Sequence, residues 1–283
     1  MASNRIRITR ASPHVGAFVA GADLSRPLPE ADLAAIRAAL AAHGVVFFRD
    51  QELSEAQHIA FAEQIGPINI NRFFKHVDGW PQIAEVRKEP EHKSNIGGGW
   101  HTDHSYDEAP ALGSALYARI VPEIGGDTIF AHMGAVFDSF SPGFQRMLEG
   151  LTAHHSSRHV FGHERPKTPG EDRAGRIGNP ELATQDAEHP VVIRHPDSGR
   201  KVLYVNPGFT RGIVGWQPGE SKALLDYLYA QATRPEFQYR FQWAKGSLAL
   251  WDNRATWHMA LNDYHGQRRL MHRITIEGVK LAA

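Results

Sequence analysis

From about residue 80 onward, the sequence is a succession of short apolar segments separated by turn residues. Short runs of this kind, rich in β-branched and aromatic residues and bounded by Gly, Pro, Asn or Asp, are typical of β-strands. Many short strands with only a few helices predict a mainly β fold with flanking helices, a jelly roll or barrel-like double sheet. The segments that fit the strand pattern are residues 82–88, 115–121, 127–133, 190–195, 201–206, 247–253 and 272–278.

The N-terminal part has a different pattern. Residues 5–10 and 45–50 are typical of strands, whereas residues 28–44 have apolar side chains at helical spacing and close with Gly44. A second helix is predicted over residues 53–66, with Ser54 as its N-cap. We expect this βαβα-like opening to pack as a layer on the main sheet. Further helical patterns occupy 141–151 and 219–233, and residues 195–201 predict a hairpin turn.

The chain of 283 residues shows no internal repeat, and a single domain over residues 1–283 is predicted. One stretch interrupts the pattern: residues 162–189 are polar and rich in Gly and Pro. Long loops in compact domains are often lids or binding loops, so a lid is one interpretation of this segment. A disordered surface insertion is the other, and the residues do not separate the two.

The amino-acid composition argues against several classes of function. Lys plus Arg and Asp plus Glu both number 31, and this balance argues against a general nucleic-acid binder. The chain has no cysteine, so any metal must be held by His, Asp or Glu. No apolar run is long enough to span a membrane, and the first residues lack the apolar core of a signal peptide. We therefore expect a cytoplasmic protein that binds neither membranes nor nucleic acid.

His101 and Asp103 are two residues apart, which in an extended segment places both side chains on one face. Thr102 would point away, and so would His104, which we expect to be a supporting or surface residue. His258, after an apolar strand and a turn, is the best third ligand. Two His and one carboxylate form the facial triad that holds non-haem iron and leaves coordination positions of the iron open. A His and an Asp two residues apart are common in sequences, so this spacing alone does not identify a metal site.

Arginines follow on a predicted strand near the C-terminus. Arg269 and Arg273 would share one face of it, and a buried guanidinium needs an anionic partner, for which a carboxylate is well shaped. Ordinary surface arginines on an edge strand are the alternative. Thr128, after the Gly125–Gly126 turn, adds a hydroxyl that can donate to a carboxylate.

In combination, these motifs resemble the taurine dioxygenase family of Fe(II)/2-oxoglutarate-dependent oxygenases, which includes 2,4-dichlorophenoxyacetate and aryloxyalkanoate dioxygenases. The Thr 27 residues after the first His, and the Arg 11 residues after the distal His, belong to this combined motif. The resemblance implies a double-stranded β-helix and a dimer or tetramer. The segments that carry it are residues 44–51, 100–106, 125–130, 195–206, 250–258 and 268–278.

The resemblance also implies roles for individual residues. The iron ligands would be His101, Asp103 and His258; Thr128 and Arg269 would bind the distal carboxylate of 2-oxoglutarate. Arg273 would meet the acidic group of the substrate, and Trp251 would lie close to the iron. The residues that fall where the family lines its substrate pocket are Asn95, Val160, Phe161 and Phe209.

One departure from the family concerns substrate. In residues 66–74, taurine enzymes carry a His and a Tyr near the sulfonate, and this chain has Asn71 and Phe74 there. A more apolar and less cationic pocket suits a larger sulfonate, sulfate ester or aryloxyalkanoate carboxylate better than taurine.

The implied reaction consumes 2-oxoglutarate and O2 at Fe(II), yields succinate and CO2, and hydroxylates a small anionic substrate. Hydroxylation next to a heteroatom would then release a fragment of the substrate. Two other functions stay open on the residues: a zinc-dependent hydrolase, because two His and one Asp also suit zinc, and a non-catalytic jelly-roll binding protein.

Overall fold

A large sheet of nine strands forms one layer of the molecule, in the order β1-β2-β3-β15-β7-β17-β6-β5, with β4 paired to β17. The computed structural model describes residues 6–166 and 172–283. Nearly all neighbours in this sheet are antiparallel; the exception is the parallel pair β2 and β3. Its strands are β1 (Arg7–Arg10), β2 (Ala17–Ala20), β3 (Val45–Phe48), β4 (Ile68–Asn69), β5 (His76–Val77), β6 (Trp80–Lys88), β7 (Gly113–Ile120), β15 (Leu248–Asp252) and β17 (Arg269–Ile276).

Smaller sheets form the second layer. One has the order β14-β8-β16, another the order β10-β9-β13, and β11 pairs with β12 alone. The strands are β8 (Thr128–His132), β14 (Gln238–Phe241), β16 (Thr256–Ala260), β9 (Thr152–Ser156), β10 (Asp186–Pro190), β13 (Thr210–Ile213), β11 (Val192–Arg194) and β12 (Lys201–Leu203). The two layers are those of a jelly roll, which confirms the predicted fold class.

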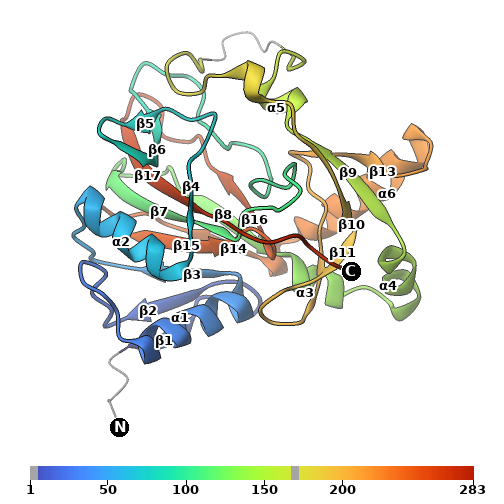
Figure 1. Cartoon of the computed structure of the whole chain (residues 1–283), viewed down its shortest axis with the longest axis horizontal. Helices are drawn as coiled ribbons and strands as arrows, with labels where there is room; N and C mark the ends of the chain where they lie inside the picture. Colours follow the sequence, from blue (N-terminus) through green and yellow to red (C-terminus); the bar gives the residue numbers. More distant parts are fainter. Residues whose placement is uncertain (1–5, 167–171) are drawn as a thin grey trace.

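The helices cover the outside of these sheets. In Figure 1, α1 and α2 lie against the outer face of the large sheet, α3, α4 and α6 flank the smaller sheets, and α5 lies at the top of the view. None of the helices in the described ranges is long and apolar enough to cross a membrane. Their bounds are α1 (Glu30–His43), α2 (Glu55–Ile65), α3 (Met133–Asp138), α4 (Pro142–Glu149), α5 (Arg158–Phe161), α6 (Pro218–Ala232) and two 3-10 turns, η1 (Pro180–Leu182) and η2 (Pro235–Phe237).

The alternation of side chains along β15 explains why both faces of the large sheet are buried. Leu248 and Leu250 belong to the core beneath α1 and α2, whereas Ala249 and Trp251 belong to the core between the two layers. Successive residues of a strand point to opposite faces, so one apolar strand contributes to both cores. Between the layers, Phe47 stacks on Phe241 with ring centroids 4.1 Å apart.

Most of the predicted elements are present. Ser54 caps α2 as expected: its backbone N donates to the Gln57 side chain at 2.8 Å, and its hydroxyl accepts from the Gln57 N–H at 3.2 Å. The antiparallel pair β11–β12 confirms the hairpin predicted at residues 195–201. Because β1, β2 and β3 extend the main sheet and only α1 and α2 lie on top of it, the expectation of a separate N-terminal layer was wrong.

Two further differences concern segment ends. The strand predicted over residues 127–133 is one residue too long at its end, because α3 begins at Met133. The His132 ring accepts from the Gly134 N–H at 3.0 Å and caps this helix. The predicted loop 162–189 is shorter than expected, because η1 lies inside it and β10 begins at Asp186. Its residues 167–171 lie outside the described residues.

A buried ionic network holds the turn between β15 and β16. Asp252 accepts from the Arg254 guanidinium at 2.9 and 2.7 Å and from His195 Nε2 at 2.9 Å. Burial alone would raise the pKa of the Asp252 carboxyl, but Arg254 and His195 hold it below its ordinary value of 3.8. Asp197 also contacts Arg254, so this guanidinium is shared by both carboxylates of a second His/Asp group, His195, Asp197 and Asp252. The network is structural.

We predict that Asp252→Ala lowers the free energy of unfolding by about 3–5 kcal/mol, because Arg254 then loses its buried counter-ion. Since the folded-state pKa of Asp252 is lowered, its contribution is present above the unfolded value of 3.8 and is lost as the pH falls below it. Denaturant titrations at several pH values measure both effects. Asp197→Asn is the matched control, because that carboxylate is 55% exposed, and it should cost far less.

Candidate metal centre and active-site cavity

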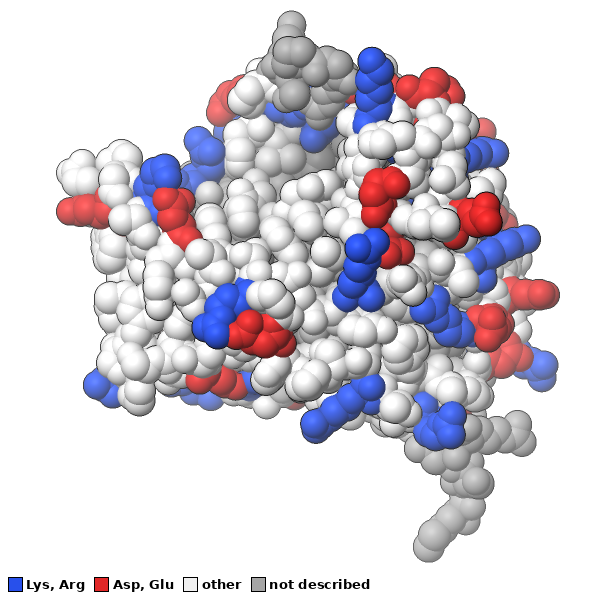
Figure 2. Space-filling view, turned by 180° about the vertical axis from the view of Figure 1, so that it is seen from behind, with Lys and Arg blue, Asp and Glu red and all other residues white. Residues whose placement is uncertain are grey.

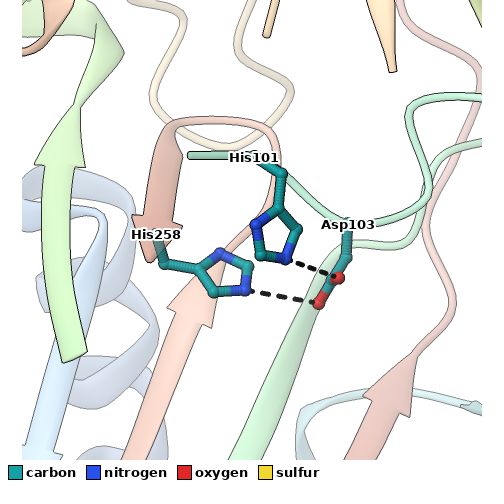
Figure 3. A group of neighbouring side chains, drawn as sticks. All are labelled: His101, Asp103 and His258. Carbon is teal, nitrogen blue, oxygen red and sulfur yellow. Dashed lines mark ion pairs between the residues drawn. The ribbon is translucent and has the colours of Figure 1, made fainter. Parts of the chain in front are cut away.

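His101, Asp103 and His258 converge although they come from distant parts of the chain (Figure 3). The backbones of His101 and His258 bond to each other in both directions, at 3.2 and 2.8 Å, so the loop before β7 is tied to β16. The Asp103 carboxylate faces both rings, 3.6 Å from His101 Nε2 and 3.8 Å from His258 Nε2. One ligand atom from each residue lies within 4.8 Å of the others, which is close enough to share one ion.

The protonation states fit a metal. His101 Nδ1 lies 2.8 Å from the Gly99 carbonyl and donates to it, which leaves Nε2 as a lone-pair ligand. Burial, followed by the neighbouring His101, lowers the pKa of His258 well below its usual value, so that imidazole is neutral. Burial would raise the pKa of Asp103, but Arg273 and His258 bring it below its ordinary value, so the carboxylate is ionised. Two imidazoles and one carboxylate fit Fe(II) in a facial triad.

The route by which Asp103 reaches this centre differs from the expected strand. Only His101 takes part in a bridge, and residues 103–106 form a turn in which His104 has a φ of 61°. His104 is buried, with Nδ1 2.8 Å from Asp107 Oδ2, so of the two expectations for it, a supporting or a surface residue, the surface one was wrong. Thr102 does point away, since its hydroxyl donates to the Asn253 carbonyl. The turn at residues 103–106, rather than strand alternation, directs the Asp103 carboxylate toward the two imidazoles.

Arg269 and Thr128 lie at one end of the cavity beside the triad. The Arg269 side chain is buried, and its Nε and Nη2 have no hydrogen-bond partner among the described residues. Burial lowers the pKa of this guanidinium, as expected for a desolvated cation that lacks an anion. Trp243 Nε1 donates to Thr128 Oγ1 at 3.0 Å, and its ring lies 5.8 Å from the Arg269 guanidinium. Trp243 was missed, because no motif in the sequence marks it.

Arg273 lies on the same face of β17, and it approaches the candidate metal ligand. Its Nη1 is 3.2 Å from Asp103 Oδ2, and its guanidinium lies 4.3 Å above the Phe74 ring. The Nε of Arg273 is buried without a partner among the described residues. Arg268, by contrast, faces outward to Glu89, whereas Arg269 and Arg273 share the buried face, as predicted. The edge-strand alternative for Arg269 and Arg273 is wrong, since β17 lies between β7 and β6.

A cavity of about 220 Å³ opens beside these polar groups. In the view from behind, Figure 2 shows the surface hollowed near the top, with Lys or Arg side chains at the edge of the hollow. Trp251 also lines the cavity, with its ring 4.7 Å from that of His258. The rest of the described lining is largely apolar: Phe74, Val86, Ile96, Trp100, Tyr106, Leu116, Val160, Phe161, Ile177, Phe209 and Ala260.

Asn71 and Asn95 are placed differently from each other. Asn71 lines the cavity, and its Oδ1 accepts from the backbone N–H groups of Phe73 and Phe74 at 3.0 and 3.1 Å. Asn95 is not among the described lining residues, because its amide donates to the Ala260 carbonyl at 2.8 Å. Val160, Phe161 and Phe209 do line the cavity. Arg173, from the segment 162–189, lines it too and was not anticipated.

Comparisons with known proteins agree with this geometry. Residues 7–275 match the family described as "Taurine catabolism dioxygenase TauD, TfdA family". The chain is 33% identical to an alkylsulfatase of Acinetobacter baylyi, over 98% of this chain and 86% of that protein. It is 32% identical to an alpha-ketoglutarate-dependent sulfate ester dioxygenase of Pseudomonas putida, over 93% and 87%. A crystal structure of a taurine dioxygenase from Burkholderia xenovorans superposes with a TM-score of 0.82 at 36% identity, covering 99% of this chain and 93% of that one.

The fold, the triad and these similarities define an oxygenase, and the chain belongs to the TauD/TfdA family. It is an Fe(II)- and 2-oxoglutarate-dependent dioxygenase that uses O2. The zinc hydrolase and the non-catalytic binding protein are not supported. Bound Fe(II) and 2-oxoglutarate supply the oxidising chemistry, and the protein contributes ligands, orientation and a water-poor cavity.

We predict that Asp103→Ala and His258→Ala each lose stoichiometric Fe(II) binding, because two remaining ligands hold the ion poorly. Metal titration under anaerobic conditions measures this without reference to turnover. His104→Ala is the control, since His104 lines the cavity but bonds to Asp107, and it should still bind one Fe(II). Full iron occupancy in either ligand variant would show that the ligand set is misassigned.

Proposed function

We propose that this enzyme hydroxylates a small organic anion carried on an apolar body: a sulfate ester, a sulfonate or an aryloxyalkanoate carboxylate. The lining of the cavity supports the proposal, since aromatic and aliphatic side chains line it together with the candidate triad and two buried arginines. Relatives named alkylsulfatase and sulfate ester dioxygenase support the same class.

We assign His101, Asp103 and His258 as the ligands of the iron, with Trp251 packed beside them. Arg269 and Thr128 would hold the distal carboxylate of 2-oxoglutarate. The unpartnered Nε and Nη2 of Arg269 support this assignment, because a bidentate carboxylate would supply the missing acceptors. Trp243 would keep the Thr128 hydroxyl oriented, since its N–H already occupies one lone pair and leaves the proton for the ligand.

Arg273 would meet the acidic group of the substrate. Its Nε lacks an acceptor, while Asp103 holds its Nη1 in place. Asn71 and Phe74 offer no cation, so taurine fits less well than an anion with a larger apolar body. Phe161 and Phe209 would pack against that body. With a sulfate ester, hydroxylation at the carbon next to oxygen gives a hemiacetal-type product, which breaks its C–O bond to leave an aldehyde and sulfate.

Other expectations remain proposals. We propose a cytoplasmic enzyme that assembles as a dimer or tetramer and takes neither nucleic acid nor membranes as partners. The single domain of residues 1–283 would carry a lid within residues 162–189, of which 167–171 lie outside the described residues. Light scattering on the purified protein measures the assembly, and limited proteolysis with and without ligands tests the lid.

A substrate panel tests the proposed function. Hexyl sulfate, hexanesulfonate and phenoxyacetate are supplied in turn with Fe(II), 2-oxoglutarate and O2, and succinate is measured against a reaction without substrate. At least one member should raise succinate above that uncoupled background, and the matching aldehyde or phenol should accompany it. If no member raises succinate above the uncoupled background, although 2-oxoglutarate is still consumed without substrate, the anionic substrate class is wrong even though the enzyme class holds.

We predict that Arg269→Ala raises the KM for 2-oxoglutarate by about 30- to 200-fold, as expected when a charge-assisted hydrogen bond is lost from a buried site. Arg273→Ala should chiefly raise the KM for the primary substrate, and uncoupled decarboxylation of 2-oxoglutarate should partly survive it. Steady-state kinetics with each compound varied in turn separate the two. The reverse pattern would exchange the roles of the two arginines.

A further inference from the structure

Lys88, the last residue of β6, is a buried cation outside the candidate metal centre. Its side chain is 2% exposed, although lysine is rarely buried without a carboxylate partner. Within the described ranges, its Nζ donates to Asn262 Oδ1 at 2.7 Å and lies 4.2 Å from the centre of the Tyr264 ring. Both of these partners are neutral, so no carboxylate in contact with Lys88 balances its charge.

The position of Lys88 in the sheet places it next to Arg269. The two residues are directly opposite each other in the antiparallel pairing of β6 with β17 (Figure 1). Residues opposite each other in this way point to the same face of the sheet, with Cβ atoms about 4.5–5.5 Å apart. Val86, two residues before Lys88, lies on this face too and lines the cavity. Lys88 and Arg269 are therefore neighbouring buried cations at one end of the inner face.

The segment 262–264, which contacts this lysine, also supports the turn that precedes Thr128. The Asp263 carboxylate accepts from the Gly126 N–H at 2.7 Å. Gly126 packs closely on Arg269, because a Cβ at this glycine would lie 3.2 Å from Arg269 Cδ. The contacts of the lysine thus continue, through this segment, to the two residues assigned to the distal carboxylate of 2-oxoglutarate.

The charges at this end of the sheet leave a positive surplus. Asp127 and Asp263 are both bound by Arg240, at 2.6 and 3.3 Å. Burial, followed by the charge of Arg176, lowers the pKa of the Lys88 ammonium, and Asp263 offsets this effect only in part. A desolvated cation of this kind gains free energy when an anion binds nearby, because little water screens the interaction.

We propose that Lys88 is a positioning residue for the cosubstrate, and that its positive charge strengthens the binding of the distal carboxylate of 2-oxoglutarate at Arg269. The inference goes beyond the contacts assigned to Arg269 and Thr128, and it rests on that assignment. Lys88 need not touch the ligand, since a charge in a desolvated site acts beyond contact distance. Asn262 and Tyr264 hold the ammonium in place, so the charge is oriented before the ligand arrives.

Binding measurements with two chelating anions test this proposal. 2-Oxoglutarate and oxalate are titrated calorimetrically, in separate runs, into the anaerobic enzyme loaded with Mn(II). Oxalate can chelate the metal but carries no distal carboxylate. Lys88→Met should raise the Kd of 2-oxoglutarate by about 5- to 50-fold, because a buried opposite charge is lost. The same change should leave the Kd of oxalate as in the wild type.

Further variants separate the charge from the hydrogen bond. Lys88→Gln keeps an N–H donor for Asn262 and should weaken 2-oxoglutarate binding as Lys88→Met does, whereas Lys88→Arg keeps the charge and should recover much of the affinity. Lys93→Met is the matched control: its carbonyl accepts from Asn262 Nδ2 at 2.8 Å, but its side chain is exposed. Both Kd values should stay at their wild-type level in this control.

Two results would overturn the role of Lys88. One is an unchanged Kd of 2-oxoglutarate in Lys88→Met or Lys88→Gln, and the other is an equal loss of oxalate binding, which would indicate a packing role. Arg269→Ala in the same titrations tests the underlying assignment. If Arg269→Ala weakens 2-oxoglutarate binding and Lys88→Met does not, only the role of Lys88 fails. If neither change weakens it, the assigned carboxylate site fails as well.

Discussion

The site depends on the pair of backbone hydrogen bonds between His101 and His258, 3.2 and 2.8 Å long. They join the loop before β7 to β16, and so they bring together two segments that are far apart in the chain. Because the backbones of His101 and His258 are bonded to each other, the turn at Asp103 has only to direct one carboxylate toward the two imidazoles. Residues 97–101 of the same loop also line the cavity.

A second constraint is electrostatic. Arg269 and Arg273 are buried on the inner face of β17, where water cannot solvate them well. One is paired with Asp103, and the other has no partner for its Nε and Nη2 among the described residues. A buried guanidinium is costly without an anionic partner, so Arg269 favours an anionic ligand in this cavity. This requirement connects the cosubstrate with the proposed substrate class.

Several parts could be predicted from the sequence because the signal is local. Strand segments follow from alternation and turn residues, and the cap at Ser54 follows from side chain-to-backbone bonding within four residues. The convergence of His101, Asp103 and His258 was expected from the H-x-D spacing and from the strand and turn before His258, and the family resemblance supported it. A strand was assumed at His104, where the chain turns with a φ of 61°, so the surface alternative for that residue was wrong. The amide of Asn95 bonds to the Ala260 carbonyl, a partner that is remote in sequence and that no local pattern indicates.

By itself the sequence determined the fold class, the absence of thiolate ligands and a set of His, Asp and Arg residues suited to iron and carboxylates. The tertiary structure decided which of these side chains meet, and which face of the cavity carries charge. The hydrogen bond of Trp243 to Thr128 and the packing of Phe74 beneath Arg273 are both contacts between distant segments. Periodicity reports the face of an element, whereas such contacts depend on how elements pack, and packing is set by the whole chain at once.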